Sequence, residues 1–360
     1  MDPAIESGAR VVVAMSGGVD SSVTAALLAE SGFDVIGITL QLYDHGSATG
    51  RKGACCAGQD IRDARAVCDQ LGIPHYVLDM EERFREAVID DFVETYGNGQ
   101  TPVPCIRCNQ SVKFTDLLQT ARELGASALA TGHYVRRVPD VGGVRMYRAR
   151  DKAKDQSYFL FATTREQLDY CRFPLGDLEK NETRAHAERL ALPVARKPES
   201  QDICFVPQGH YSSLLRKLRP DAMQQGDIVH VDGKVLGRHQ GVGHYTVGQR
   251  RGLEVSTGER LYVVEIDRGR HRILVGPRKA TLSRSMELRN LNLLAEMPDV
   301  LGVSAKHRYN EPAVAARFHH AQGILEFAEP QSGIAKGQAA VLYDGDRVLG
   351  GGWIHAAHPC

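Results

Sequence analysis

Two short stretches contain the side chains best suited to covalent chemistry. TPVPCIRCNQ (101–110) places Cys105 and Cys108 three residues apart, and SQDICFVPQGH (200–210) contains Cys204. A thiolate is both a nucleophile and a soft metal ligand. In a reducing compartment, a close pair of cysteines indicates metal or redox chemistry. Because the sequence lacks a second pair at zinc spacing, a four-thiolate zinc site is not expected.

The other five of the eight cysteines are weaker candidates. Cys68 falls within a helical pattern and Cys171 near the end of another, so both are expected to be packing residues. Cys360 is the last residue of the sequence and is expected to be inert. Cys55 and Cys56 are adjacent, and neighbouring side chains usually point apart, so a functional role for them is the less favoured interpretation.

A second candidate site lies near the N-terminus, in VVVAMSGGVDSSVTAALLAE (11–30). A run of β-branched residues leads into Ser16, Gly17 and Gly18, and an apolar-periodic segment follows, so the pattern predicts a strand, a glycine turn and a helix. The unpaired N–H groups and the positive end of a helix would face an anion that two glycines allow to approach closely. The loop therefore favours phosphate. It lacks the Gly-Lys-Ser/Thr ending of a Walker loop, and a plain strand-to-helix connection remains the alternative.

Alternating strand and helix signals continue to about residue 205. We expect strands at 34–40, 74–80 and 126–133 and helices at 59–71, 81–96 and 113–124, with Cys105 and Cys108 in a Pro-rich loop between two helices. This alternation predicts an α/β fold, a doubly wound parallel sheet whose ligands bind beyond the carboxyl ends of the strands. SGG (16–18) and TGH (131–133) both follow strand ends, so we expect both to face one ligand.

From about residue 206 the pattern changes to short β-like runs separated by glycine, namely 226–237, 244–248 and 260–276, and the helices are expected to stop. The last stretch predicts a small closed antiparallel β-barrel. We therefore expect a catalytic domain at 8–205, a basic β-rich domain at 206–280 and a C-terminal β-barrel at 281–360.

Charge is unevenly distributed along a chain whose formal net charge is zero. Residues 1–205 carry a net charge of −5, residues 206–290 carry +7 and residues 291–360 carry −2. A basic segment of this kind favours binding to the phosphate backbone of a nucleic acid, although scattered arginines more often form an ordinary solvent-exposed surface. The apolar and charged fractions, 42% and 24%, are those of a soluble globular protein. No apolar run approaches the ~20 residues of a membrane span, and no signal peptide is recognisable, so a cytoplasmic protein without membrane association is expected.

SGGVDS (16–21) resembles the signature of the PP-loop ATP pyrophosphatases, and the whole chain resembles one branch of them, the bacterial tRNA-specific 2-thiouridylases. The matching blocks run in order from about residue 10 to 353: AMSGGVDSS (14–22), TPVPCIRCN (101–109), ATGHY (130–134), KDQSYFL (154–160), DICF (202–205), GRHQGVGHYTVGQRRGL (237–253), HRY (307–309) and KGQAAVLY (336–343).

The resemblance implies a reaction in which ATP activates a uracil carbonyl. Transfer of AMP to the C2 oxygen of uridine 34 turns a poor leaving group into one that sulfur can displace, with release of pyrophosphate and AMP. Mg²⁺ is expected on the phosphates. The residues that the resemblance assigns to ATP are Ala14, Met15, Ser16, Gly17, Gly18, Val19, Asp20, Ser21, Leu40 and Gly132.

The resemblance also implies how sulfur arrives. Cys204 matches the family's persulfide cysteine, and Cys108 matches the partner that attacks the persulfide, which leaves a Cys108–Cys204 disulfide to be reduced. Cys105 stands where many thiouridylases carry an aspartate, so the proton-transfer role of that carboxylate is in doubt here. With Cys105, three thiolates are enough to hold a [4Fe–4S] cluster, which is the alternative route to sulfur.

Further matches imply contacts with tRNA. They are His133, Lys154, Asp155, Gln156, Arg308, Tyr309 and Gln338. Tyr309 is expected to stack on an anticodon base, or else to be an ordinary surface tyrosine of the barrel. The resemblance implies tRNAs with Lys, Glu and Gln anticodons as substrates and a sulfur-relay protein as donor. A PP-loop synthetase for a small molecule and a non-catalytic tRNA- or redox-sensing protein remain the alternative functions.

Overall fold

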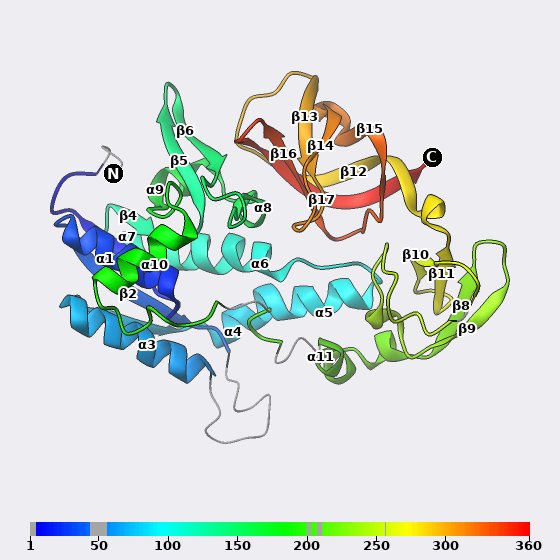
Figure 1. The fold of residues 1–360 in the computed structure, drawn as a ribbon, viewed down its shortest axis with the longest axis horizontal. Helices are drawn as coiled ribbons and strands as arrows, with labels where there is room; N and C mark the ends of the chain where they lie inside the picture. The colour runs from blue at the N-terminus through cyan, green and yellow to red at the C-terminus, as the bar shows by residue number, and fades with distance from the viewer. Residues whose placement is uncertain (1–4, 44–55, 200–202, 207–210, 256) are drawn as a thin grey trace. The chain divides into compact units, whose positions relative to one another are not determined.

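The computed structural model describes residues 5–43, 56–199, 203–206, 211–255 and 257–360 (Figure 1). The chain forms two compact units. One comprises Met1–Val88, Cys105–Phe205 and Asp346–Val348, and the other comprises Ile89–Pro104, Val206–Gly345 and Leu349–Cys360.

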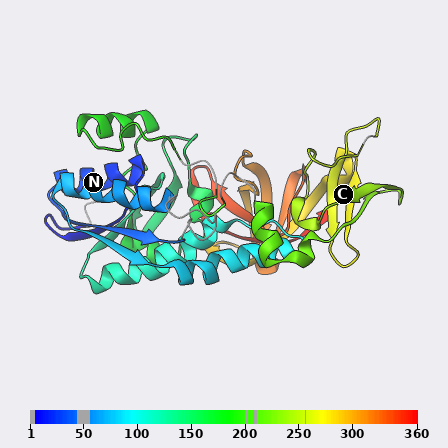
Figure 2. The same cartoon turned by 90° about the horizontal axis from the view of Figure 1, so that it is seen from below.

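A five-stranded parallel sheet forms the centre of the first unit, in the order β3-β2-β1-β4-β7. Its strands are β1 (Arg10–Ala14), β2 (Asp34–Gln41), β3 (His75–Asp79), β4 (Ala128–Ala130) and β7 (Cys171–Arg172). Val11, Val12 and Val13 are all fully buried, which requires protein on both faces of β1. Figure 2 shows helices on the two sides of this sheet. The expected doubly wound α/β fold is confirmed.

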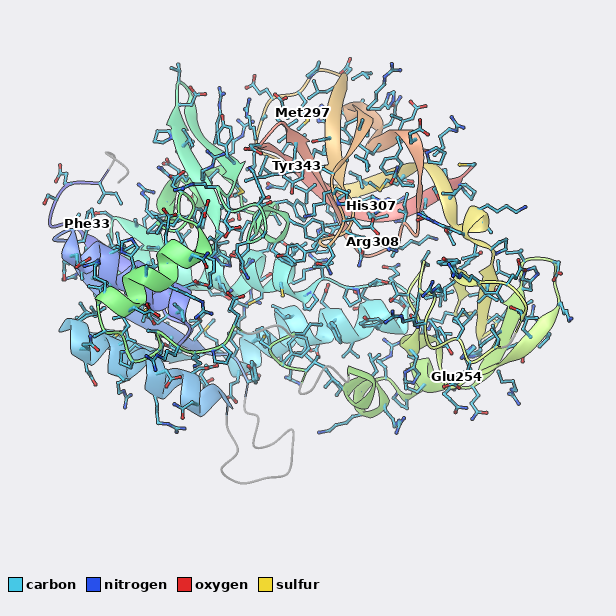
Figure 3. All side chains as sticks on the ribbon, viewed as in Figure 1. Phe33, Glu254, Met297, His307, Arg308 and Tyr343 are labelled. Atoms are coloured by element: carbon cyan, nitrogen blue, oxygen red, sulfur yellow. The ribbon has the colours of Figure 1, made fainter. Side chains whose placement is uncertain are left out.

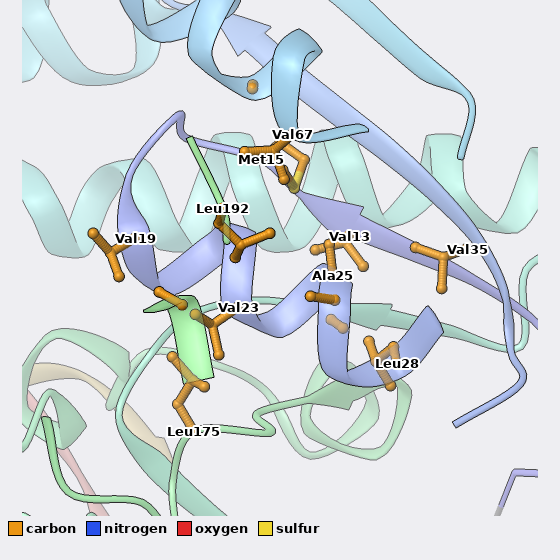
Figure 4. Close-up of a cluster of buried hydrophobic side chains, with 14 of the residues drawn as sticks. Val13, Met15, Val19, Val23, Ala25, Leu28, Val35, Val67, Leu175 and Leu192 are labelled. Carbon is orange, nitrogen blue, oxygen red and sulfur yellow. The ribbon is translucent and has the colours of Figure 1, made fainter. Parts of the chain in front are cut away.

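Helices α1 (Val19–Glu30) and α3 (Cys56–Leu71) pack on one face of the sheet. Figure 4 shows the core between them, in which Val13 of β1 and Met15, just after β1, meet Val23 of α1 and Val67 of α3. Small buried residues of α1, including Ser22 and Ala25, keep this helix close to the sheet.

The segment from 81 to 97 differs from the expected single helix at 81–96. It divides into α4 (Glu81–Phe84), a π-helical segment η1 (Arg85–Ile89) and α5 (Asp90–Gly97). The two compact units also divide in this stretch, after Val88. The apolar periodicity continues across the change in helix type, which is why periodicity alone predicted one helix.

The cysteine pair lies in a helix, so the predicted Pro-rich loop is wrong. Cys105 is in α6 (Pro104–Arg107), and Cys108 begins a π-helical segment η2 (Cys108–Leu117) that continues into α7 (Leu118–Glu123). Pro104 is the first helical residue, where its fixed φ and missing N–H are favourable. Proline here starts the helix.

Other elements of the first unit surround the sheet. They are a hairpin of β5 (Val135–Asp140) and β6 (Gly143–Arg148) and the helices α8 (Ser157–Leu160), α9 (Arg165–Tyr170) and α10 (Lys180–Arg189). The segment Asp346–Val348 pairs with β6 through Arg347 and Tyr147.

The second unit contains a four-stranded sheet in the order β10-β11-β8-β9. Its strands are β8 (Gly226–His230), β9 (Val235–His239), β10 (Tyr262–Asp267) and β11 (Arg272–Gly276). Helix α11 (Tyr211–Leu218) and the 3₁₀ turn η4 (Pro220–Met223) precede it, so the expectation that helices stop at 206 is wrong. The expected β-run at 244–248 is also absent, because the 3₁₀ turn η5 (Val242–His244) and left-handed Gly248 occupy this region.

Six antiparallel strands form the predicted closed β-barrel of this unit, with β12 paired to β17. They are β12 (Leu282–Leu293), β13 (Val300–Lys306), β14 (Val314–His319), β15 (Ile324–Ser332), β16 (Ala339–Asp344) and β17 (Arg347–Pro359). Met286, Phe318 and Leu342 are fully buried in its core.

Candidate functional site

The order of the parallel strands creates a switch point between β1 and β4. The chain runs outward from β1 to β2 and β3 and then returns to the other side of β1 as β4. Loops that leave neighbouring strands in opposite directions open a crevice at their carboxyl ends, where α/β proteins bind ligands. SGG follows β1 and TGH follows β4, so the expectation that both loops face one place agrees with the strand order.

The loop between β1 and α1 is held by two serines. The Ser16 backbone N–H donates to Ser21 Oγ at 3.1 Å, and the two hydroxyl oxygens are also 3.1 Å apart. Gly17 has a left-handed φ of 71°, and a Cβ there would lie 2.2 Å from the Asp60 carbonyl oxygen of α3. Only glycine fits this position, and the first N–H groups of α1 have no partner within the helix. The loop has the geometry of an anion site.

The second loop packs against the first. A Cβ on Gly132 would lie 2.8 Å from the backbone of both Asp20 and Ser21 at the start of α1. Leu40 lies half-buried near the carboxyl end of β2, beside β1 in the sheet. The fold therefore places the residues expected to bind ATP around one end of the sheet, while their individual contacts with ATP stay predictions.

Asp20, the acid of the SGGVDS signature, is held by a buried polar cluster. Its Oδ1 accepts from Lys180 Nζ at 2.6 Å and from Tyr134 Oη at 2.9 Å, and the same Tyr134 oxygen lies 2.9 Å from Thr183 Oγ1. Burial and the charge of Asp20 raise the pKa of Tyr134 above its usual value, so this hydroxyl stays protonated as a donor. Lys180 is one-tenth exposed and also pairs with Glu199 at 3.1 Å.

The three candidate thiols lie within electrostatic reach of one another, although Cys108 and Cys204 are 96 residues apart in the chain. Cys108 is buried, whereas Cys105 and Cys204 reach the surface. Surrounding protein raises the pKa of the Cys204 thiol to about 12, and Cys108 and Cys105 add to this rise. Phe205 packs edge-on against Phe84 at 5.7 Å and holds the chain next to Cys204.

Lys113 is the cation that acts on this thiol group. Desolvation by the surrounding protein raises the pKa of both Cys105 and Cys108, and Lys113 opposes the rise in each case, as it does at Cys204. Lys113 lies in the π-helical segment five residues after Cys108, where i→i+5 hydrogen bonds stack such residues along the helix. No sequence motif singled this lysine out.

The cluster route receives no support from the arrangement of these side chains. In the described ranges, no group of three or more His, Cys, Asp or Glu side chains is placed to hold a metal ion. A [4Fe–4S] cluster on Cys105, Cys108 and Cys204 therefore stays a prediction. Cys68 and Cys171 are fully buried, as expected for packing residues, and burial raises the pKa of each to about 12. Cys55 and the side chain of Cys56 lie outside the described residues.

The residues of the first unit that are expected to contact tRNA differ in their burial and in their partners within the protein. Lys154 pairs with Glu199 at 2.7 Å, and the Gln156 side chain accepts from the Tyr134 backbone N–H at 2.9 Å. Asp155 is buried and accepts from Ser157 Oγ at 2.8 Å. His133 is half-buried near the Phe114 ring, and burial keeps its pKa well below the usual value, so the ring is neutral at pH 7.

In the second unit, Arg308 joins the barrel to the preceding sheet domain. Its Nη2 donates to the carbonyl oxygen of Val247 at 2.9 Å and to that of Gly333, and Nη1 donates to Glu311 at 3.2 Å. Figure 3 labels Arg308 beside His307. The Tyr309 ring lies under the Lys306 ammonium at 5.2 Å. The contacts of these residues with tRNA stay predictions, as does that of Gln338.

Parallel-sheet topology, a glycine loop at the switch point and two following β-domains define a PP-loop type of nucleotide-binding α/β enzyme. Three family models match consecutive parts of the chain: the tRNA methyl transferase HUP domain over residues 9–208, the tRNA methyl transferase PRC-barrel domain over 213–277, and the aminomethyltransferase beta-barrel domain over 283–354.

Curated relatives match almost the whole length. The chain is 57% identical to the tRNA-specific 2-thiouridylase MnmA of Parvibaculum lavamentivorans, with 98% of this chain and 92% of the relative covered. The proteins of the same name from Rhizorhabdus wittichii and Rhodospirillum centenum are 59% and 60% identical, covering 99% and 96% of this chain and 94% and 91% of theirs. The chain belongs to the tRNA-specific 2-thiouridylase family.

In the part of the chain that the structure describes, no helix is long and apolar enough to cross a lipid bilayer.

Proposed function

We propose that this protein is an ATP-dependent tRNA 2-thiouridylase that replaces the C2 oxygen of uridine 34 with sulfur. The observation that carries the proposal is one α/β unit that contains both a phosphate-type loop at the switch point and a group of three interacting thiols. Near-complete coverage of thiouridylase relatives supports the same reaction. A small-molecule synthetase would not need the two β-domains that these relatives share.

In the first step, the uridine O2 attacks the α-phosphorus of ATP, an O–P bond forms, and pyrophosphate leaves. The N–H groups at the start of α1 stabilise the developing charge on the phosphates. Asp20 offers a carboxylate at this loop, and Mg²⁺ prefers such oxygen ligands. Bound there, Mg²⁺ would neutralise phosphate charge.

In the second step, a donor persulfide transfers its outer sulfur to Cys204. The Cys108 thiolate attacks the inner sulfur of the Cys204 persulfide, the persulfide S–S bond breaks, and hydrosulfide departs with the electron pair. Hydrosulfide adds to C2 of the adenylated uridine, and AMP leaves with the former O2. A dithiol reductant then returns two electrons to the Cys108–Cys204 disulfide.

The proposal extends to partners. A sulfur-relay protein that carries a persulfide transfers sulfur to Cys204, and tRNAs with Lys, Glu and Gln anticodons are the substrates. The +7 charge of residues 206–290 suits the phosphate backbone of such a substrate.

The test is to incubate the full chain with Mg·ATP, a persulfide donor and unmodified tRNA, and to measure thiouridine, AMP and pyrophosphate. Equal amounts of the three products are expected. A parallel incubation with S-adenosylmethionine addresses the methyl transfer named in two of the matching family models. Pyrophosphate release that requires a small acid or amine instead of tRNA would reject the proposal, as would methylated tRNA without thiouridine.

A further inference from the structure

Lys197 lies seven residues before Cys204 and holds the phosphate-type loop. Its Nζ donates to the Gly17 carbonyl oxygen at 3.0 Å, to Asp60 Oδ1 at 2.7 Å and to Asp63 Oδ2 at 2.5 Å. One ammonium group thus connects the loop, helix α3 and the chain segment that leads to the persulfide cysteine. All three N–H donors of the Lys197 ammonium are used, two in charge-assisted bonds to carboxylates and one in a bond to a carbonyl oxygen.

Glu199, two residues further on, reaches the same loop by another route. It accepts from Lys154 Nζ at 2.7 Å and from Lys180 Nζ at 3.1 Å. Lys180 in turn donates to Asp20 Oδ1 at 2.6 Å. Lys180 is only one-tenth exposed, so little water competes for its bonds to Glu199 and Asp20, whereas the Lys154–Glu199 pair is more exposed to solvent.

The two contacts restrict where Cys204 can lie. An extended chain spans at most about 3.6 Å per residue, so the Cα of Cys204 lies within roughly 18 Å of the Cα of Glu199. On its other side, Phe205 is buried against Phe84. Lys197 and Glu199 before Cys204, and Phe205 after it, are therefore each held by contacts, and the contacts on the first side lead to the nucleotide loop.

We infer that Lys197 and Glu199 are positioning residues that tether the Cys204-bearing segment to the phosphate-binding loop, so that sulfur is delivered where the nucleotide activates the uridine. The inference rests on the proposed function. Its physical basis is that a reactive group held near its target reacts far faster than a free one, and a displacement of about 1 Å costs roughly a hundredfold. Neither residue touches the reacting atoms.

The experiment separates activation from sulfur transfer in the full chain. Pyrophosphate and thiouridine are measured in single turnovers on unmodified tRNA for wild type, Glu199→Gln and Lys197→Met. Each variant loses at least two charge-assisted bonds, which is expected to lower the ratio of thiouridine to pyrophosphate at least about tenfold. Glu199→Asp and Lys197→Arg keep the charge and should recover part of the ratio. Glu188→Gln makes the same change at an exposed position of α10 and should leave the ratio at the wild-type value.

Two other results would overturn the inference. An unchanged ratio in Glu199→Gln and Lys197→Met, with wild type thiolating normally, rejects the tether while leaving the proposed function intact. A parallel fall of both products together with a lower melting temperature, not reversed in Glu199→Asp or Lys197→Arg, assigns these residues a purely structural role. Wild type that releases pyrophosphate without thiouridine rejects the proposed function itself.

Discussion

Cys105 is the residue whose role differs most between the two sulfur routes. It reaches the surface, and its charge contributes to the raised pKa of Cys204, so it is a neighbour of the reacting thiols. In the persulfide route only Cys108 and Cys204 change bonding partners. In a cluster route all three would be ligands, and a serine would replace a soft ligand with a poor one.

Cys105→Ser is therefore expected to retain single-turnover thiolation within about threefold of wild type, the range of a modest change in a neighbouring pKa. Cys108→Ser and Cys204→Ser are expected to abolish it. Anaerobic purification, iron analysis and a thiolation assay make the comparison. An inactive Cys105→Ser that also lacks iron present in wild type would contradict the persulfide route.

Lys113 is expected to control what fraction of the three cysteine thiols is ionised to thiolate. Because the pKa of Cys108 is raised by burial, its thiolate is scarce near pH 7 and increases about tenfold per pH unit below the pKa. Under single-turnover conditions limited by sulfur release, the rate should rise with pH from 7 to 9. Lys113→Met removes the opposing cation, so the pKa rises further and the rate at pH 7 falls roughly three- to tenfold.

Lys113→Arg is the matched control and should stay near wild type. A Lys113→Met variant with an unchanged pH profile would show that the lysine does not act on the reacting thiol. His133 gives no second inflection in this range, because its lowered pKa keeps it neutral throughout.

At the scale of elements, the contact between TGH and the start of α1 leaves no room for a side chain at Gly132. A methyl group in Gly132→Ala would meet the backbone of Asp20 and Ser21 at 2.8 Å and push the loop from its place. Overpacking of this kind costs about 1–3 kcal/mol. ATP affinity is expected to weaken by roughly ten- to a hundredfold if this cost falls on the bound state.

Equilibrium binding of ATP to the full chain measures the effect. Gly302→Ala, in strand β13, adds the same methyl group where nothing lies within 4 Å and should bind ATP as wild type does. Equal affinities for the two variants would show that the TGH loop does not shape the nucleotide site.

Arg308 connects elements of the second unit by donating to the carbonyl oxygens of Val247 and Gly333. Lysine lacks the planar fork that makes such paired bonds. Arg308→Lys should therefore lower the free energy of unfolding by about 1.5–3 kcal/mol, the range for hydrogen bonds from charged groups. Thermal denaturation measures this, with exposed Arg317→Lys of β14 as the control. An unchanged melting temperature with weaker tRNA binding would instead favour the phosphate-contact role.

At the scale of the whole molecule, the basic segment at 206–290 predicts tRNA binding that weakens steeply with salt. Arg250 and Arg251 are both exposed there. The double variant Arg250→Gln/Arg251→Gln should bind tRNA more weakly and reduce the slope of log affinity against log salt by up to about two, roughly one for each phosphate that the protein no longer neutralises.

Arg65→Gln/Arg165→Gln removes the same charge from exposed positions of the first unit and is the control. Binding titrations at several salt concentrations compare the slopes. Equal slopes for the two double variants would show that the basic segment does not bind the phosphate backbone.

The sequence alone determined the local features. β-branched runs predicted β1, β2 and β3, and the glycine turn before α1 predicted the phosphate-type loop, because strand propensity and helix-start chemistry depend on neighbouring residues. The cysteines were recognisable from residue type. The helix at 104–107 was missed because Pro104 indicates a loop as readily as a helix start, and α11 was missed because it lies beside a glycine-rich β-pattern.

Tertiary structure alone decided the pairings between distant residues. Nothing in the order of residues shows that Lys180 holds Asp20, that Lys197 reaches Gly17 or that the charge of Lys113 acts on all three thiols. The resemblance suggested tRNA contacts for Lys154 and Arg308, whereas the fold gives each a partner within the protein. Such contacts depend on how far the folded chain brings separate segments together, and burial then sets the strength of each charge, which a linear sequence does not contain.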